Sequence, residues 1–191
     1  MKITKKGWLF LAVIGLHLAV VILIALTTTS TSVQRTIVRV MGLSALIILF
    51  YAATITLFLK YIVKHFGKSF VKIHHTFVLT GFGLLLIHGI TYAIALSSGL
   101  SIELWTIFSM IGDTCAIIAI IAAIKRRKWT KIWRYLHMLM YWMLIFITFH
   151  GIFGGTDFTT PAILGIYISM LVAVGITVIL KRRQLARIKR E

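Results

Sequence analysis

Residues 104–128 read LWTIFSMIGDTCAIIAIIAAIKRRK, an apolar run that ends on four consecutive basic residues. The apolar part, 104–124, is about the length that an α-helix needs to cross roughly 30 Å of hydrocarbon at about 1.5 Å per residue. The positive-inside rule places a basic cluster of this kind in the cytoplasm. This one stretch therefore predicts a transmembrane helix and the direction in which it runs.

Five further apolar runs of similar length lie at 8–26, 40–63, 73–96, 135–154 and 161–180. Of the 191 residues, 60% are hydrophobic and 13% are charged, and the mean hydropathy is +1.00. A soluble protein of this size needs more polar surface than this composition supplies, which excludes a soluble helical domain. We predict an all-α, six-helix transmembrane bundle that forms a single domain over residues 1–191, and its first run is too long for a cleaved signal peptide.

The basic residues alternate between the two ends of the predicted helices. The N-terminal segment, the loops near 60–72 and 125–134, and the tail after residue 180 together carry 19 of the 21 lysines and arginines. Only Arg35 and Arg39 fall on the other side. We therefore expect both termini to lie in the cytoplasm. We also expect the protein to reside in a prokaryotic plasma membrane. Membrane orientation and contact with anionic lipid explain the net charge of +17 better than nucleic-acid binding does.

Histidine is rare inside bilayers, so the seven histidines of this chain need a reason. Four of them form matched pairs in two of the predicted helices: His74 with His88, 14 residues apart, and His137 with His150, 13 residues apart. Each pair spans about 20 Å along its helix. Because an even number of crossings separates these two helices, they run in the same direction. His74 and His137 should then lie near the cytoplasmic face, and His88 and His150 toward the outer face.

Two imidazoles at each of two depths suit two stacked haems, each with a histidine in both axial positions. Iron ligated in this way has no open coordination site, which favours electron transfer over oxygen binding. At about 100° per residue, the 14-residue spacing keeps His74 and His88 on one face. The 13-residue spacing leaves His137 and His150 about 140° out of line, so that helix must be locally rewound or tilted. We favour His74 as the inner ligand, and His75 is the alternative.

The segments that carry these histidines, KIHHT at 72–76 with HG at 88–89 and WRYLH at 133–137 with HG at 150–151, resemble the ferric-reductase-like transmembrane domain. That superfamily includes ferric reductases, NADPH oxidases and the haem-binding subunit of the periplasmic methionine sulfoxide reductase system. The resemblance covers the second to the sixth helix and implies that these histidines hold b-type haems. Ferric reductases and NADPH oxidases usually add an FAD and NADPH domain, which this sequence does not contain. In that respect it is more similar to the sulfoxide reductase subunit, as the membrane electron-transfer component of an oxidoreductase.

The function we expect is electron transfer through two haem b groups, from a cytoplasmic flavoprotein or a quinol to an extracytoplasmic acceptor such as ferric iron, a partner protein or oxygen. A flavin bound by a loop is compatible with the chain, although no motif supports it. Two alternatives remain open: a divalent-metal transporter or channel that uses the histidines, and a structural subunit with no cofactor. Only Asp113 and Cys115 add ligand types that metal pathways commonly use, and we expect Cys115 to be a small buried thiol.

Basic residues near the histidines are candidates for binding haem propionates. On the inner side these are Lys72, Lys131 and Arg134, of which Arg134 is the best placed in the sequence. On the outer side only Arg35 and Arg39 are available. Each of the three inner residues is equally well explained by the positive-inside rule.

Five other residues complete the predictions. Trp142 and Phe146 lie between the two histidine levels, where one of them could separate the haems, although packing is the more ordinary role. His17 and Asp113 are both expected near the membrane midplane, where a contact between them or a proton path would explain their presence. His65 falls in a basic loop, where we expect it to be solvated.

Overall fold

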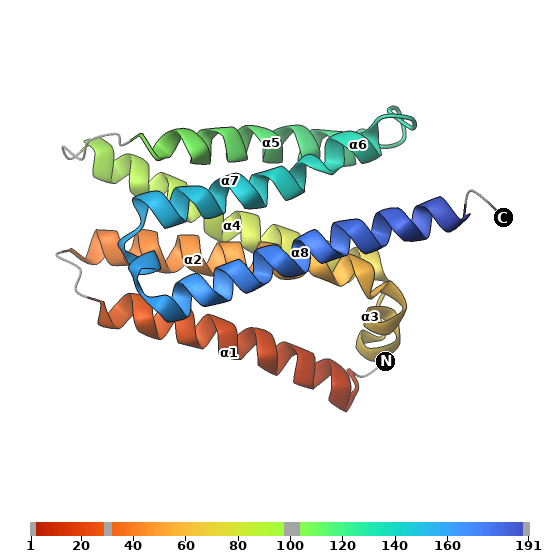
Figure 1. Cartoon of the computed structure of the whole chain (residues 1–191), viewed down its shortest axis with the longest axis horizontal. Helices are drawn as coiled ribbons and strands as arrows, with labels where there is room; N and C mark the ends of the chain where they lie inside the picture. Colours follow the sequence, from red (N-terminus) through yellow and green to blue (C-terminus); the bar gives the residue numbers. More distant parts are fainter. Residues whose placement is uncertain (1–2, 29–31, 98–103, 189–191) are drawn as a thin grey trace.

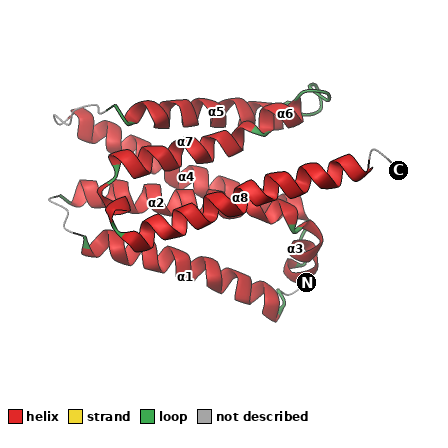
Figure 2. Cartoon of the chain, in the orientation of Figure 1, coloured by secondary structure: helices red, strands yellow, loops and turns green. Residues whose placement is uncertain are grey.

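The computed structural model describes residues 3–28, 32–97 and 104–188 (Figure 1). These residues are almost entirely helical, with no strand among them (Figure 2). Within them, six helices are long and apolar enough to cross a membrane, which confirms the predicted all-α bundle. In chain order the elements are α1 (Lys5–Thr27), α2 (Val33–Thr54), η1 (Ile55–Leu57), α3 (Leu59–Phe66), α4 (Phe70–Ser97), α5 (Thr106–Ile124), α6 (Trp133–His137), α7 (Leu139–Gly154), η2 (Thr156–Thr159) and α8 (Pro161–Ile188).

The second span differs most from its prediction, because it covers Val33–Leu57 rather than 40–63. Two threonine hydroxyls bond back to helix carbonyls where α2 ends: Thr54 Oγ1 donates to the carbonyl of Phe50 at 2.9 Å, and Thr56 Oγ1 to that of Ala53 at 2.7 Å. Such bonds compete with the regular helix ladder and commonly bend helices. The chain tightens into η1 and then turns into α3, which lies across one end of the bundle (Figure 1).

The short helix α3 is amphipathic and is fastened to the start of α1. Its Ile62 and Phe66 are buried, whereas Lys60 is exposed. His65 is also buried: its Nδ1 lies 2.9 Å from Thr4 Oγ1, and its carbonyl accepts the Thr4 N–H at 3.0 Å. The expectation of a solvated His65 is therefore wrong, because these residues form a helix that packs against α1 rather than an open loop.

The helix α2 is the centre of the bundle. Of its span 56% is buried, against 6% of the α4 span, and α2 packs on α1, α4, α7 and α8. The α4 contact is close where Gly81 faces Leu49, because a Cβ at Gly81 would lie 2.7 Å from Leu49 Cδ2. Glycine at this position therefore allows the two helices to approach each other.

A second packing unit consists of α5 with α6 and α7. The helices α6 and α7 form one span, Trp133–Gly154, which is interrupted at Met138. The Met138 N–H is shared between the carbonyls of Arg134 at 3.1 Å and Tyr135 at 3.2 Å, a mixture of α and 3₁₀ bonding. Because a 3₁₀ turn rotates further per residue than an α turn, this break supplies part of the local rewinding that the 13-residue histidine spacing requires.

The segments that carry the basic clusters gather at one end of the bundle, which we call the basic end. The N-terminus, α3, the loop between α5 and α6, and the C-terminal part of α8 all lie there (Figure 1). The element η2, the C-terminal ends of α1 and α4 and the N-terminal ends of α2 and α5 lie at the opposite end (Figure 1). The arrangement of charge expected from the sequence is thus present in the fold, and the side of the membrane that each end faces stays a prediction.

Candidate functional site

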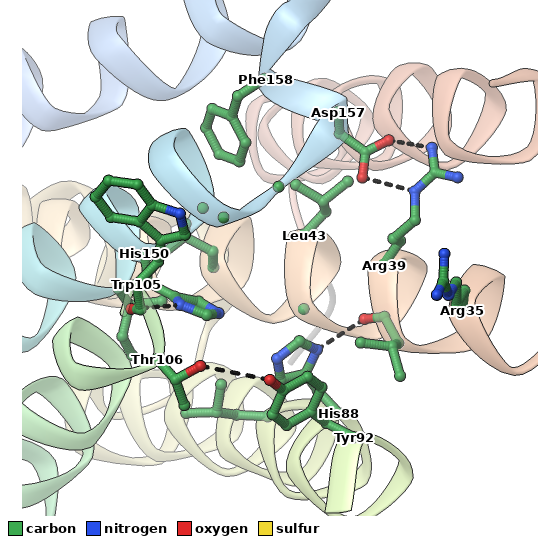
Figure 3. Close-up of a pocket in the computed structure, with 18 residues that line it drawn as sticks. Arg35, Arg39, Leu43, His88, Tyr92, Trp105, Thr106, His150, Asp157 and Phe158 are labelled. Carbon is green, nitrogen blue, oxygen red and sulfur yellow. Dashed lines mark hydrogen bonds and ion pairs between the residues drawn. The ribbon is translucent and has the colours of Figure 1, made fainter. Parts of the chain in front are cut away.

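Two histidines near the opposite end of the bundle share one cavity. His88 of α4 and His150 of α7 both line a space of about 320 Å³ between α2, α4, α7 and the start of α5 (Figure 3). The Nδ1 of His88 lies 2.7 Å from the carbonyl of Val38, and that of His150 lies 3.0 Å from the carbonyl of Trp105. A carbonyl can only accept, so each Nδ1 carries the proton and each Nε2 keeps a free lone pair.

The other two predicted ligands have the same arrangement nearer the basic end. His74 of α4 has its Nδ1 3.1 Å from the carbonyl of Ala52, and His137 of α6 has its Nδ1 3.3 Å from the carbonyl of Ala119. The structure therefore brings His88 and His150 to one cavity and places His74 and His137 nearer the basic end, and in all four histidines Nδ1 lies against a backbone carbonyl.

The neighbouring His75 differs from His74 in this respect. Its side chain is exposed, and no hydrogen bond from it is present in the part of the chain that the structure describes. A metal-ligating histidine usually donates its other ring N–H to a carbonyl or carboxylate, which fixes the tautomer and the ring orientation. Of the two candidates for the inner ligand, His74 is the one with this support.

Glycines leave room beside the outer pair. A Cβ at Gly42 would lie 2.7 Å from the Nδ1 of His88, and a Cβ at Gly151 would lie 2.6 Å from Cε2 of Phe158. Both glycines line the cavity with largely apolar and aromatic neighbours. Neutral imidazoles in an apolar cradle fit the chemistry of a haem, whose iron takes axial nitrogen ligands and whose macrocycle is apolar.

A buried ion pair closes one side of this cavity. Arg39 of α2 donates from Nε to Asp157 Oδ2 at 2.8 Å and from Nη2 to Asp157 Oδ1 (Figure 3). The two side chains are only 14% and 4% exposed. Arg39 is therefore already engaged by the protein. Arg35 also lines the cavity, and among the described residues no acceptor bonds its guanidinium.

The inner basic residues chosen from the sequence lie at the surface. Lys72, Lys131 and Arg134 are all exposed, and the guanidinium of Arg134 lies 5.7 Å from the ring centroid of Trp133. Sequence reasoning did not single out Lys181 of α8, whose side chain is half-buried. Its position at the end of an apolar run makes it look like an ordinary flanking lysine, so no local signal distinguishes it.

The predicted contact between His17 and Asp113 is wrong. The Nδ1 of His17 lies 2.6 Å from the hydroxyl of Tyr51 instead. Asp113 of α5 has an exposed side chain and does not line the cavity of the outer histidines. The sequence gives the depth of these residues but not the neighbours of their helices, and α1 packs on α2 rather than on α5.

The aromatic residues between the histidine levels take part in packing and face the surface. Trp142 is 55% exposed, which suits contact with lipid. Phe146 stacks on Phe108 of α5 with a centroid separation of 6.5 Å. Neither Trp142 nor Phe146 lines the cavity of the outer histidines.

The histidines do not gather into a cage for a bare metal ion. No group of three or more His, Cys, Asp or Glu side chains that could hold one occurs among the described residues. Each level instead offers two imidazoles from different helices, which is the donor set of a cofactor that supplies its own equatorial ligands. Comparison with known proteins finds no protein family, no curated protein and no solved structure that matches this chain.

Proposed function

We propose that this chain is a membrane-embedded b-type cytochrome that carries electrons across the bilayer through two haems, each ligated by two histidines. One observation supports the proposal above the others: His74, His88, His137 and His150 all have Nδ1 against a backbone carbonyl. The hydrogen bond fixes the tautomer with a free Nε2 and holds the ring in place. The same feature at all four predicted ligands would be an unexplained coincidence in an ordinary helical bundle.

At each level the two histidines come from different helices, and each histidine is hydrogen-bonded to a different neighbouring helix. His74 and His88 project from α4 and are tethered to α2, whereas His137 and His150 project from α6 and α7 and are tethered to α5 or its N-cap. The chain thus presents one preoriented imidazole from each side at each level. Bound haem iron would supply the one-electron redox chemistry, and the residues supply ligation, orientation and an apolar surrounding.

The resemblance to the ferric-reductase-like transmembrane domain supports the same conclusion. It implies an electron donor at the basic end, a cytoplasmic flavoprotein or a quinol, and an extracytoplasmic acceptor or partner protein. In this proposal the protein lies in a prokaryotic plasma membrane, with its basic end inside as the positive-inside rule requires. No observation in the structure favours divalent-metal transport over this function.

The first experiment is to purify the full chain in mild detergent from haem-replete cells and to measure its visible spectrum and its pyridine haemochrome. We expect a reduced spectrum with a sharp b-type α-band and two haems per chain, because the proposal gives the chain two bis-imidazole sites. A single haem would mean that one level is not a site. A colourless, folded protein would contradict the proposal.

A second experiment tests transmembrane transfer itself. Proteoliposomes that contain ferricyanide are mixed anaerobically with an external reductant that does not cross lipid, and the loss of ferricyanide absorbance is followed. We expect loss only when the haem-loaded chain is present. The matched control is the chain with His88 and His150 both changed to Leu, which interrupts the path at one level. Equal rates for the two proteins would argue against conduction through the outer histidines.

A further inference from the structure

A second cavity lies toward the basic end, between α1, the end of α2, η1 and α3. Its volume is about 330 Å³, close to that of the cavity at the outer histidines. Aromatic rings supply most of its lining, namely Phe10 of α1, Tyr51 of α2, and Phe58 and Tyr61 of α3. Pockets of this size and character bind small apolar molecules in proteins. The proposed electron path does not use this cavity.

The polar groups beside this cavity are already engaged by the protein. The hydroxyl of Tyr51 lies 2.6 Å from Nδ1 of His17, and the hydroxyl of Thr54 donates to the carbonyl of Phe50 at 2.9 Å. The surface that faces into the cavity is apolar. A polar headgroup inside the cavity would lose its hydrogen bonds to water and gain none. The part of a ligand that enters must therefore be hydrocarbon.

The walls of the cavity are held in place where α1 and α3 meet. The Thr4 N–H donates to the carbonyl of His65 at 3.0 Å, and Thr4 Oγ1 lies 2.9 Å from Nδ1 of His65. A Cβ at Gly7 would lie 2.8 Å from the same carbonyl oxygen, so the two helices approach closely here. The ring of His65 also packs on that of Tyr61, with a centroid separation of 4.2 Å. The cavity is therefore bounded by helices that are fastened to each other.

Lysines lie beside the cavity on both helices. Lys6 is one turn before Phe10 on α1, and Lys64 is three residues after Tyr61 on α3. Side chains at these spacings share one face of a helix, so each lysine lies next to a residue that lines the cavity. Both lysines are exposed at the basic end, and neither forms an ion pair with any residue that the structure describes. An anion from outside the chain can therefore bind there.

We propose that this cavity binds an acyl chain of an anionic phospholipid, whose phosphate is held by Lys6 and Lys64. Charge complementarity identifies the occupant, because a neutral lipid would leave the lysines without a partner and a soluble anion would leave the cavity empty. Ammonium groups bind phosphate oxygens as point charges and require no planar match. The amphipathic helix α3, which lies across one end of the bundle, has the character of a helix in the membrane interface (Figure 1). The site does not depend on the proposed haems.

The first test measures lipid binding to the full chain by native mass spectrometry in detergent, with dioleoyl phosphatidylglycerol and dioleoyl phosphatidylcholine as probes. The double variant Lys6→Gln with Lys64→Gln removes the phosphate contacts. The control, Arg127→Gln with Lys128→Gln, removes the same charge from exposed positions between α5 and α6. We expect the wild type to prefer phosphatidylglycerol, the lysine variant to bind it about 30-fold more weakly, and the control to match the wild type. Equal binding of the two lipids, or equal weakening in both variants, would contradict the proposal.

The second test concerns the acyl chain. Phe58 and Leu59 are neighbours with similar exposure, 51% and 47%, but only Phe58 lines the cavity. Phe58→Gln places an amide against the hydrocarbon and should weaken phosphatidylglycerol binding about tenfold, whereas Leu59→Gln should not. Dihexanoyl phosphatidylglycerol tests the same point on the unaltered chain, because it has the same headgroup and short acyl chains. If it binds as tightly as the dioleoyl lipid, the cavity does not hold an acyl chain and the proposal is wrong.

A long-chain quinone is the competing occupant, since its isoprenoid tail is also apolar. If ubiquinone-10 displaces phosphatidylglycerol and binds equally to the wild type and to the Lys6 and Lys64 variant, the cavity holds that tail and the proposal is wrong. The lipid measurements also separate this inference from the proposed function. A colourless chain with the expected lipid preference would contradict only the cytochrome, and a haem-loaded chain without that preference would contradict only the lipid site.

Discussion

At the scale of single residues, short hydrogen bonds and close contacts set the positions of the imidazoles at the two histidine levels. Each ligand candidate is held by one hydrogen bond to a carbonyl, between 2.7 Å for His88 and 3.3 Å for His137. Removing an imidazole removes one axial ligand, whereas crowding an imidazole moves it away from the position that its hydrogen bond sets. These two kinds of change give different predictions.

Replacement of His150 by Leu should remove the outer haem and leave the inner one, since only one axial ligand would remain at that level. Pyridine haemochrome analysis should then give one haem per chain instead of two. His75→Leu is the control, because the His75 side chain is exposed and lies outside the hydrogen-bonded set. Loss of a haem in the control with none lost in His150→Leu would reverse the ligand assignment.

Replacement of Gly42 by Ala should displace the ring of His88, because the added Cβ would lie 2.7 Å from Nδ1. Overpacking of this kind costs about 1–3 kcal/mol, and we expect weaker retention of the outer haem with altered g-values in electron paramagnetic resonance. Gly83→Ala is the matched control, because nothing lies within 4 Å of a Cβ at that position. The control should be neutral or slightly stabilising, by up to about 1 kcal/mol from helix propensity. Identical spectra for Gly42→Ala and wild type would show that His88 does not depend on this contact.

At the scale of elements, the ion pair between Arg39 and Asp157 joins the short helix η2 to α2. Asp157→Asn would leave a mostly buried guanidinium without its partner, which typically costs about 3–5 kcal/mol. We expect a clear fall in Tm, measured in detergent by differential scanning fluorimetry. The double variant Arg39→Met with Asp157→Leu should recover much of that loss, because it removes both charges. Arg35→Met is the control, because the Arg35 side chain is exposed, and it should change Tm little. If Arg35→Met lowered Tm as much as Asp157→Asn does, the pairing of Arg39 with Asp157 would not be what stabilises η2.

Elements differ in how far the sequence predicts them. The long apolar runs predict the six spans well, since length and composition decide whether a helix can cross a membrane. The break between α2 and α3 was missed because Leu57 and Phe58 continue the apolar run, and hydropathy carries no signal for a hydrogen bond from a side chain to the backbone such as that of Thr56. The histidine spacing predicted that this helix is locally rewound. It did not predict where, because the position depends on which carbonyls accept from the Met138 N–H.

For the whole molecule, the direction of the chain in the membrane is the property that the charge pattern predicts. In a Cys115→Ser background, Val33→Cys and Lys128→Cys place single thiols at the opposite end and at the basic end. Both positions are exposed in the structure. A membrane-impermeant maleimide applied to intact cells should label the Val33 variant, and the Lys128 variant only after permeabilisation. The reverse pattern would place the basic end outside.

The site was predictable in part for a physical reason. Spacing along a helix fixes depth, so the two histidine levels follow from the sequence, whereas contacts between distant segments do not. Arg39 was a candidate for binding an outer haem propionate and instead pairs with Asp157, which lies 118 residues away. His17 contacts Tyr51 because α1 packs on α2. Local pattern carries no information about such pairings.

The four carbonyl tethers divide the molecule into two half-sites. The histidines of α4 are held by α2, those of α6 and α7 are held by α5 or its N-cap, and α4 and α7 pack on α2 and α5 rather than on each other. A chain cut between α4 and α5 would therefore yield two fragments, each with one finished half of both centres. Such fragments should reassociate most efficiently in cells that are well supplied with haem, because one bound haem would be ligated by a histidine from each fragment and would hold the two together.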